Sequence, residues 1–493
     1  MSARRRAPLW LVLVAASLPM FMATLDNLVI TNALPVMGPD LGATIEELQW
    51  FINAFTLTFA TFILGAAALG DRIGRRTVFV AGIAVFTAAS VLTALSTEPW
   101  MVIGARAVQG LGAAAIMPLS LTLLAGAVSE RMRPAAIGIW GGVSGLGVAL
   151  GPLIGGAIVE GWNWQAIFWI NVPIGLVAIP LALAVLPNSR GARRPIDLAG
   201  IALAGLGVLG LVYGIVRGND AGWDSLEVMG SLIAGAVLLV AFVAWEARTS
   251  SPLLPLRLFR DRSFSAANVV GFAFSFGVFG AIFILIQFLQ VVQGKSALEA
   301  GLMTTPWTIA PMVVAPIAGF IAPRVGTRVL MATGLAFQSG ALFWLAAVLA
   351  ADVEYSALVI PFLLAGVGMG LVFAPMATAV LANMPGDDHA KASGANSTLR
   401  EVGGALGVAV LTAVFVGAGG SLTPTGYVDA AIPAVATGAG ALGVAFLLAF
   451  LLPAGRSTAT ARDTEAVEGL GRADVASALE AELGELEPVP AIR

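Results

Sequence analysis

GDRIGRR, residues 70–76, is a short charged segment in a chain of 493 residues with a mean hydropathy of +0.92. It separates two apolar runs of about twenty residues, each long enough to cross the roughly 30 Å hydrocarbon core of a bilayer as a helix. Only 11% of the residues are charged and 58% are hydrophobic, too little polar surface for a water-soluble domain. The sequence therefore predicts an all-α protein that crosses a membrane many times, because helices satisfy their own backbone hydrogen bonds.

Apolar runs of this length recur along the whole chain. Met1 to Met20 resembles a signal peptide, but no small-residue cleavage site stands out, so we expect the first span to be retained. The pattern predicts fourteen transmembrane helices. Their expected limits are 9–34, 48–69, 77–96, 100–124, 136–159, 164–186, 197–217, 228–248, 264–292, 299–322, 329–350, 356–381, 394–418 and 430–453.

The distribution of basic residues tests this count. With the N-terminus in the cytoplasm, 22 of the 26 basic residues fall in cytoplasmic segments. Arg217 and Lys295 fall on the other side, and Arg106 and Arg400 lie inside spans. Because Lys and Arg favour the cytoplasmic side, we expect both termini in the cytoplasm. The excess of arginine over lysine, 24 to 2, is typical of a GC-rich bacterium, which places the chain in a bacterial cytoplasmic membrane.

A second copy of the charged segment indicates an internal repeat. APRVGTR, residues 322–328, matches residues 70–76 after a shift of 252 positions, which aligns Gly74 with Gly326. Parallel repeats of this kind are typical of transporters. We therefore expect an N-terminal six-helix half (1–186), a cytoplasmic linker with two inserted helices (187–255), a C-terminal six-helix half (256–453) and a flexible acidic tail (454–493).

Six segments, in this order, resemble motifs of the major facilitator superfamily and of its fourteen-helix drug:proton antiporter branch. The resemblance covers nearly the whole chain and implies the major facilitator fold, with two six-helix halves and two inserted central helices. The segments are LDNLVITNALP (25–35), GDRIGRR (70–76), RAVQGLGAA (106–114), GLGVALGPLIGG (145–156), WQAIFWINVPIG (164–175) and FLQVVQGKSALEAGL (288–302).

The resemblance implies a cytoplasmic gate at the opening segment. By analogy, Asp71 docks near the start of the thirteenth helix, close to Ser393 and Gly394, where a helix N-terminus favours a carboxylate. A simpler interpretation is that the arginines only set the topology, but this leaves the aspartate and the glycines unexplained. The gate residues are Gly70, Asp71, Arg72, Gly74, Arg75 and Arg76.

The fifth span carries the motif that, by resemblance, separates exporters from importers. A dinucleotide-binding loop is excluded because it needs a preceding strand. The small residues allow close helix packing, and the proline can bend the helix between two states, so plain packing and bending both stay open. The motif residues are Gly147, Gly151, Pro152, Gly155 and Gly156.

Ionisable residues inside a span are costly and usually functional. Asp26 and Arg106 lie at matching depth, roughly 9–12 Å below the outer surface at 1.5 Å per residue, so we expect them to pair. The pair could be purely structural, or Asp26 could take up a proton or a cationic substrate. Glu401 is a second candidate for a protonatable site, whereas Arg400 could extend to the membrane interface.

Other side chains are candidates for the substrate cavity, with packing against lipid as the alternative: Asn53, Gln109, Trp50, Phe55 and Phe276. The chain has no cysteine and a single histidine, His389, in a loop beside acidic residues. We therefore expect no enzyme, metal or cofactor, and no nucleic-acid partner. The expected partners are a small molecule, protons and the lipid bilayer, and we expect a monomer.

These observations predict a secondary active exporter that exchanges small amphipathic or cationic organic compounds, such as drugs or antibiotics, for protons. An uptake, metabolite or lipid transporter of the same fold would be expected to lack the fifth-span motif. A non-transporting membrane sensor would not need the buried Asp26 and Arg106.

Overall fold

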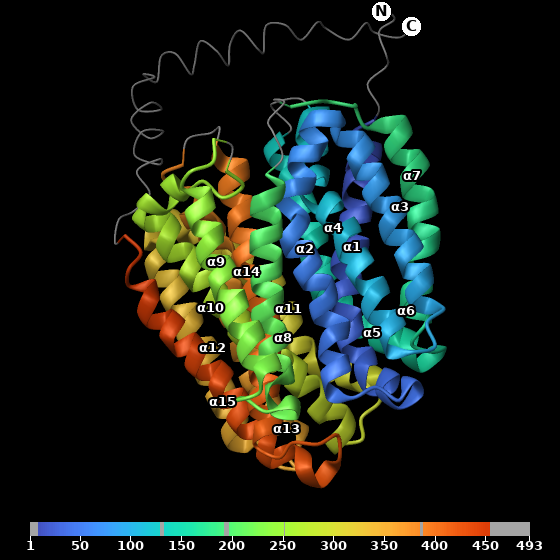
Figure 1. Cartoon of the computed structure of the whole chain (residues 1–493), viewed down its shortest axis with the longest axis vertical. Helices are drawn as coiled ribbons and strands as arrows, with labels where there is room; N and C mark the ends of the chain where they lie inside the picture. Colours follow the sequence, from blue (N-terminus) through green and yellow to red (C-terminus); the bar gives the residue numbers. More distant parts are fainter. Residues whose placement is uncertain (1–7, 129–132, 192–196, 251, 385–387, 454–493) are drawn as a thin grey trace, which may run out of the picture.

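The computed structural model describes residues 8–128, 133–191, 197–250, 252–384 and 388–453, and the regular elements in these ranges are helices (Figure 1). The long helices run side by side from one end of the molecule to the other. Their bounds are α1 Leu9–Leu41, α2 Ile45–Ile73, α3 Arg75–Ala94, α4 Pro99–Ala127, α5 Arg133–Gly161, α6 Ala166–Trp169, α7 Asn171–Val185, α8 Leu198–Ala221, α9 Leu226–Glu246, η2 Leu256–Arg260, α10 Arg262–Gln287, η3 Phe288–Val292, α11 Ala297–Val325, α12 Thr327–Val348, α13 Tyr355–Leu381, α14 His389–Gly417 and α15 Pro424–Ala449.

The predicted all-α fold with fourteen spans is confirmed. Within the described residues, 13 helical stretches are long and apolar enough to cross a bilayer, with α6 and α7 together forming one of them. Helix α5 supplies the remaining span, through its apolar segment Leu150–Gly161. The chain is a multi-pass membrane protein.

The first two helices are longer than the apolar pattern predicts. Helix α1 continues through Pro35 and Pro39 and ends at Gly42, whose φ of 62° is left-handed. Helix α2 begins three residues before the predicted span, because Thr44 and Glu47 form a capping box. Hydropathy detects the part of a helix that lies in lipid, whereas caps decide where the helix ends.

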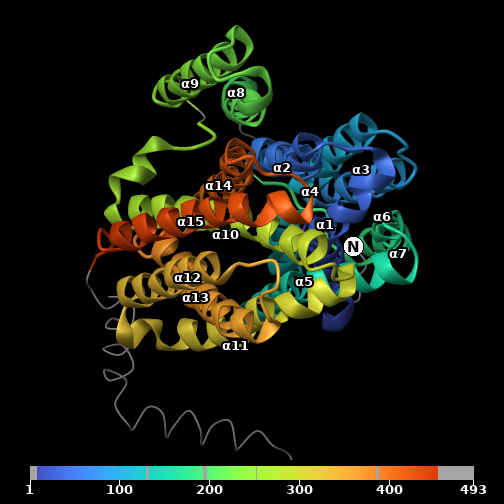
Figure 2. The ribbon, with the colours of Figure 1, turned by 90° about the horizontal axis from the view of Figure 1, so that it is seen from below.

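The helices form two bundles and a separate hairpin. Helices α1–α7 pack mainly on one another, as do α10–α15, and these sets are called the first and second bundle below. The two bundles meet where α2 packs on α14 and where α5 packs on α11. Helices α8 and α9 pair outside both bundles, and α8 packs on them through α2 and α14 (Figure 2).

Two glycines mark the repeat in the fold. Gly74 joins α2 to α3 with a φ of 129°, and Gly326 joins α11 to α12 with a φ of 94°. A side chain at either position would be strained, so each joint requires glycine. The end of the molecule that carries these joints is called the motif face below, and the opposite end the distal face.

Large apolar side chains on the outside of the bundle are exposed, as expected of a surface in contact with lipid. Trp10 is 63% exposed near the motif face, and Trp100 and Trp162 are 70% and 78% exposed near the distal face. Tryptophan is enriched at both membrane interfaces. These side chains are therefore placed to mark the two edges of the bilayer.

Candidate functional site

A carboxylate lies midway along α1, in the interior of the first bundle. Asp26 is 3% exposed, and Arg106 of α4 is completely buried. Arg106 Nη1 donates a hydrogen bond to Asp26 Oδ2 and forms an ion pair with it. The structure thus brings together the two residues that the sequence places at the same depth.

Two amide side chains complete the environment of the carboxylate. Gln109 Nε2 lies 3.0 Å and Asn171 Nδ2 lies 2.7 Å from Asp26 Oδ1, and both donate to it. The same amide groups also donate to Ser90 Oγ, at 2.9 and 3.2 Å. Asp26, Ser90, Arg106, Gln109 and Asn171 are called the buried polar cluster below. It ties together α1, α3, α4 and α7.

Further contacts hold the guanidinium of Arg106 in place. Its Nε donates to the carbonyl oxygen of Phe51 at 3.0 Å, and its Nη1 donates to Gln109 Oε1 at 2.9 Å. The guanidinium carbon lies 4.4 Å above the centre of the Phe55 ring. A buried charge needs such partners to offset its loss of water, so a change in the charge of Asp26 would disturb the contacts of α4 with α1 and α2.

A small cavity of about 30 Å³ lies between the two bundles. Among the residues that line it, Glu401 carries the charge, and two phenylalanines and several polar residues share the lining. A cavity of this volume has room for about one water molecule. The lining residues are Asn27, Leu28, Thr31, Ile52, Thr56, Phe279, Ile282, Phe283, Glu401, Gly404 and Val408.

Helix α1 separates the cavity from the buried polar cluster. Asp26 points into the first bundle, whereas its neighbour Asn27 lines the cavity. Adjacent residues of a helix point about 100° apart, so one turn of α1 serves both sites. The two acidic residues Asp26 and Glu401 therefore occupy different compartments.

The charged segment 70–76 packs against the chain that follows α7. Asp71 Oδ1 accepts from Arg75 Nε at 2.7 Å, and the backbone N–H of Gly191 donates to the carbonyl oxygen of Asp71 at 3.0 Å. Arg76 Nη1 donates to the carbonyl oxygens of Leu183 and Leu186, at 2.8 and 3.0 Å. Among the described residues, Asp71 thus pairs within its own bundle in this state, and not with the start of α14.

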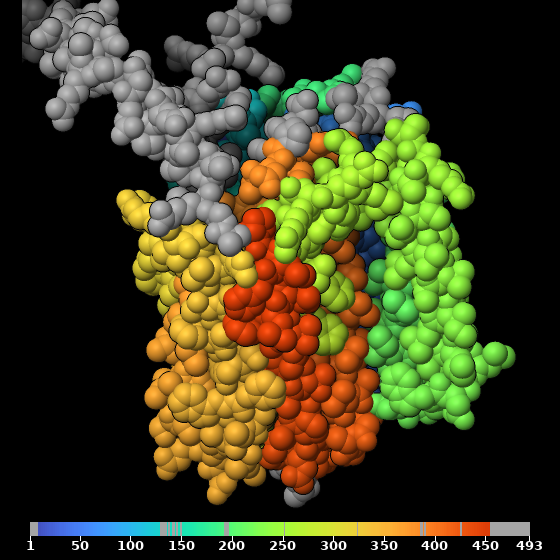
Figure 3. All heavy atoms as spheres, turned by 90° about the vertical axis from the view of Figure 1, so that its left-hand side faces the viewer, coloured from blue at the N-terminus to red at the C-terminus, as the bar shows by residue number. Residues whose placement is uncertain are grey.

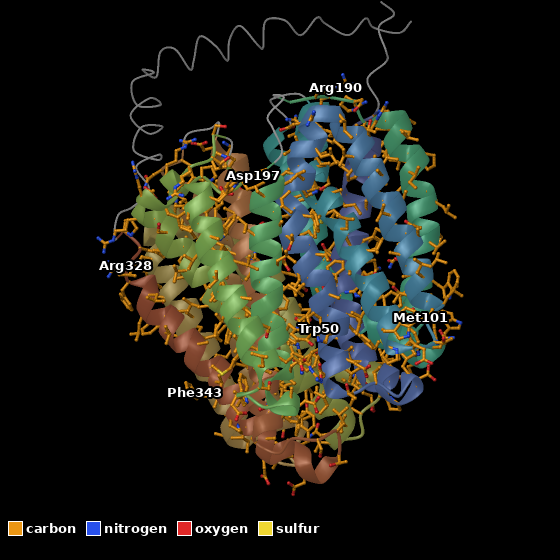
Figure 4. The ribbon with its side chains drawn as sticks, viewed as in Figure 1. Trp50, Met101, Arg190, Asp197, Arg328 and Phe343 are labelled. Carbon is orange, nitrogen blue, oxygen red and sulfur yellow. The ribbon has the colours of Figure 1, made fainter. Side chains whose placement is uncertain are left out.

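The other residues of the predicted gate surround this contact at the motif face. Gly70 packs on α4, where a Cβ would lie 2.7 Å from a methyl group of Leu119. Arg72 is exposed at the end of α2, and Gly74 forms the joint to α3 beside Asn188. Arg190 also lies at this face (Figure 4).

The glycines of α5 face two different helices. A Cβ on Gly147, Gly151 or Gly155 would lie 3.3, 2.7 or 2.8 Å from side-chain atoms of α1. A Cβ on Gly156 would overlap the backbone of α11 at Ala297. The carbonyl oxygen of Pro152 accepts from Asn32 Nδ2 of α1 at 2.6 Å. The motif therefore packs α5 on its own bundle and on the other bundle at once.

The sequence of these two bundles, with the cavity between them, matches a known family. Residues 16–408 match the Major Facilitator Superfamily. The chain belongs to this superfamily. Curated relatives include the tetracenomycin C resistance and export protein of Streptomyces glaucescens, which is 33% identical over 86% of this chain and 79% of its own length.

Two other relatives of this superfamily member have related names. The multidrug resistance protein Stp of Mycobacterium tuberculosis is 35% identical over 86% of this chain and 79% of its own length. The cephamycin export protein CmcT of Amycolatopsis lactamdurans is 38% identical over 84% of this chain and 86% of its own length.

Solved structures of transporters share the major facilitator fold. A bacterial homologue of the human lysosomal transporter Spinster, inward-facing and unoccupied, has a TM-score of 0.63 at 17% identity and covers 91% of this chain and 98% of its own. A peptide transporter POT in complex with sulfate has a TM-score of 0.65 at 17% identity, covering 89% and 93%. At this identity the likeness concerns the fold alone.

The residues predicted for the substrate cavity occupy several places. Gln109 belongs to the buried polar cluster, and Phe55 lies under Arg106. Trp50 lies beside α8, with its ring 6.4 Å from that of Tyr213 (Figure 4). Asn53 is completely buried in α2.

Phe276 packs α10 on α14, because its backbone lies against Gly407. The cavity between the bundles is instead lined by Asn27, Thr31, Phe279 and Phe283, which the sequence did not single out. These residues lie on helices that also carry recognised motifs, but only the packing of the two bundles shows which face of each helix reaches the cavity.

Sequence reasoning also missed two members of the buried polar cluster. Asn171 lies in the quoted segment WQAIFWINVPIG, and an amide inside an apolar run was a signal that could have found it. Ser90 lies in a run of small residues on α3, where a hydroxyl usually bonds to its own helix. Nothing in the sequence around Ser90 indicates its contact with α4 and α7.

Proposed function

We propose that this superfamily member is a proton-coupled exporter that exchanges small amphipathic or cationic organic compounds, including drugs or antibiotics, for protons. The names of the relatives, which are resistance and export proteins, support the direction of transport. The observation that carries the coupling is the ion pair of Asp26 and Arg106, closed off inside the first bundle.

Asp26 has the properties that a coupling site needs. Its charge is balanced by Arg106 and by amide donors from α4 and α7, so taking up a proton would weaken contacts among three helices. A proton that changes helix contacts can bias the equilibrium between two states of the transporter. Asp26 is thus the primary coupling residue of this proposal, with Arg106 as its counter-charge.

Glu401 is the second acidic residue of the proposal. It lines the cavity between the bundles, where a cationic substrate would lie against Phe279 and Phe283. A proton and a cation bound to one carboxylate exclude each other, which is the requirement for exchange. An uptake or lipid transporter of the same fold is the alternative, and the direction of proton-driven transport distinguishes it.

The remaining features follow from the same proposal. The motif face, with the 70–76 segment as the gate, lies in the cytoplasm of a bacterial cell, together with both termini. The N-terminal half (1–186) and the C-terminal half (256–453) rock against each other, and residues 187–255 connect them. The protein acts as a monomer.

The decisive experiment measures the accumulation of a fluorescent lipophilic cation in proteoliposomes under an imposed pH gradient. Asp26→Asn removes the charge that responds to protons, so we expect accumulation to fall to the level of protein-free liposomes. Arg106→Ala should also lose transport, and it should destabilise the protein by about 3–5 kcal/mol because it leaves a buried carboxylate unpaired.

Glu98→Gln is the matched control, because it also converts an acid to an amide in the first bundle but at an exposed position. This variant should transport at the wild-type rate. If Asp26→Asn still accumulates the cation against its gradient, Asp26 is not the coupling residue and Glu401 takes its place. If the wild-type protein ignores the pH gradient, proton coupling itself is wrong.

A further inference from the structure

A groove of about 190 Å³ lies between α10 and α15, at the end of these helices nearest the motif face. It lies on the outer surface of the second bundle and is distinct from the central cavity. Figure 3 shows this side of the molecule, where the C-terminal end of α15 lies beside the segment that leads into α10. The groove is lined by Arg262, Ser265, Ala266, Val269, Leu448 and Leu451.

The lining residues divide the groove into a charged end and an apolar wall. Arg262, Ala266 and Val269 follow one another at helical spacing on one face of α10 and span roughly 10 Å along its axis. Leu448 and Leu451 of the α15 end form the opposite side. Val269 is 48% and Leu451 is 46% exposed, so the apolar wall is open sideways to the bilayer.

The end of α15 contacts two guanidinium groups, of which Arg262 lines the groove. Arg262 is exposed and its Nε donates to the carbonyl oxygen of Leu451 at 3.0 Å, while its terminal nitrogens have no hydrogen-bond partner among the described residues. Arg328 of α12 lies with its guanidinium carbon 5.2 Å from the centre of the Phe450 ring. Phe450 and Leu451, consecutive residues at the end of α15, therefore each contact one arginine at the motif face.

The acidic side chain beside Arg262 is already engaged. Asp261 Oδ1 accepts from the backbone N–H of Phe264 at 2.8 Å, and its Oδ2 accepts from Asn383 Nδ2 at 2.9 Å. Ser265 Oγ donates to the carbonyl oxygen of Phe259 at 2.6 Å. Arg262 thus keeps hydrogen-bond donors for a further anion at the mouth of the groove.

We propose that this groove binds an anionic glycerophospholipid from the leaflet at the motif face. Its phosphate lies at Arg262, and one acyl chain follows Val269 along the wall formed with Leu448. Arginine forms strong, directional hydrogen bonds to phosphate, and basic pockets between transmembrane helices are typical sites for anionic headgroups. A soluble anion would not use the apolar wall, and the cationic headgroup of a zwitterionic lipid would be repelled by the guanidinium of Arg262. The site is independent of the proposed transport function.

The test is native mass spectrometry of the full-length protein in detergent with equimolar phosphatidylglycerol and phosphatidylcholine. We expect the wild-type protein to retain phosphatidylglycerol preferentially. Arg262→Gln should weaken this binding by about fivefold, since a basic residue at a membrane surface contributes about that factor. Val269→Trp, which fills the groove and keeps the charge, should reduce it as well.

Arg324→Gln is the matched control, because Arg324 is also an exposed arginine at the end of a helix at the motif face but does not line the groove. It should leave the binding unchanged. Equal retention of both lipids by the wild-type protein, or an equal loss in Arg324→Gln, overturns the proposal. So does competition by glycerophosphoglycerol, the headgroup without chains, at the same concentration. A dimer that Val269→Trp abolishes would make a second copy of the chain the occupant.

Discussion

At the scale of single residues, two hydroxyls on α3 show how similar side chains differ in role. Ser90 and Thr93 are both completely buried, and both donate to a carbonyl oxygen one turn earlier at 2.9 Å. Ser90 Oγ also accepts from Gln109 and Asn171 and so belongs to the buried polar cluster. Of these two residues, Ser90 is therefore the one whose hydroxyl joins α3 to other helices.

We predict that Ser90→Ala lowers the free energy of unfolding by about 1 kcal/mol, the usual range for hydrogen bonds between membrane helices. The cost arises because Gln109 and Asn171 lose an acceptor that water cannot replace. Thermal unfolding in detergent measures the effect. Thr93→Val removes a hydroxyl of the same helix while keeping its shape, and it should change the free energy by much less. Equal effects of the two substitutions would contradict a special role for Ser90.

At the scale of one helix, α5 uses its glycines on two sides. Three of them, at four-residue spacing, pack on α1 of the same bundle, and Gly156 packs on the backbone of α11 in the other bundle. Glu160 Oε2 accepts from Ser296 Oγ at 2.5 Å one turn further on. The closure of the distal face therefore depends on the missing side chain at Gly156.

We predict that Gly156→Ala opens the distal face, because its methyl group overlaps the backbone of Ala297. Overpacking of this kind costs about 1–3 kcal/mol, enough to change the ratio of two states by about 5- to 150-fold. The chain has no cysteine, so spin labels can be attached only at introduced cysteines. Labels at Trp162→Cys and Lys295→Cys measure the distance between the two bundles at the distal face. Their separation should increase.

Gly161→Ala is the control for this experiment, since a Cβ there meets nothing within 4 Å. The labelled control should show the distance distribution of the parent protein. An unchanged distribution in Gly156→Ala would mean that α5 and α11 do not form the closing contact.

At the scale of the whole molecule, helix α8 packs on both bundles to a similar extent but through different kinds of contact. It follows α2 over much of its length, from the contact of Ile201 with Gly65 to the ion pair of Arg217 with Glu46 at 3.2 Å. Towards α14 it uses small apolar side chains and one hydrogen bond, from Asn219 Nδ2 to the carbonyl oxygen of Ala413. We infer that α8 moves with the first bundle and that its contact with α14 slides.

Crosslinking can test whether α8 moves with the first bundle and slides on α14. Thr61→Cys with Gly205→Cys joins α8 to α2, where a Cβ at Gly205 would lie 2.5 Å from the methyl group that the Thr61 substitution removes. Asn219→Cys with Gly417→Cys joins α8 to α14, where a Cβ at Gly417 would lie 3.5 Å from the Asn219 side chain. A short bifunctional thiol reagent should leave transport intact in the first pair and stop it in the second. A monofunctional reagent should affect neither. Loss of transport in the first pair would show that α8 does not travel with α2.

The sequence by itself determined the membrane-embedded helical fold, the number of spans and the repeat, because each depends on local chemistry. A helix that lies in lipid needs apolar side chains, so its hydropathy shows in the sequence. Gly74 and Gly326 have a positive φ that strains any other residue, so both copies of the repeated segment keep glycine at this position. The partnership of Asp26 and Arg106 could also be predicted, because depth in a membrane is a single coordinate that residue counting supplies.

Only the tertiary structure decided which face of each helix meets which neighbour. Residue counting gives depth but not rotation, so Asn171 and Ser90 were missing from the predicted cluster, and Asn27 and Thr31 from the predicted cavity. The groove at Arg262 arises where α10 and α15, far apart in the chain, pack together. Rotation about a helix axis is set by packing against other helices, and this information is spread over the whole chain rather than held in any one segment.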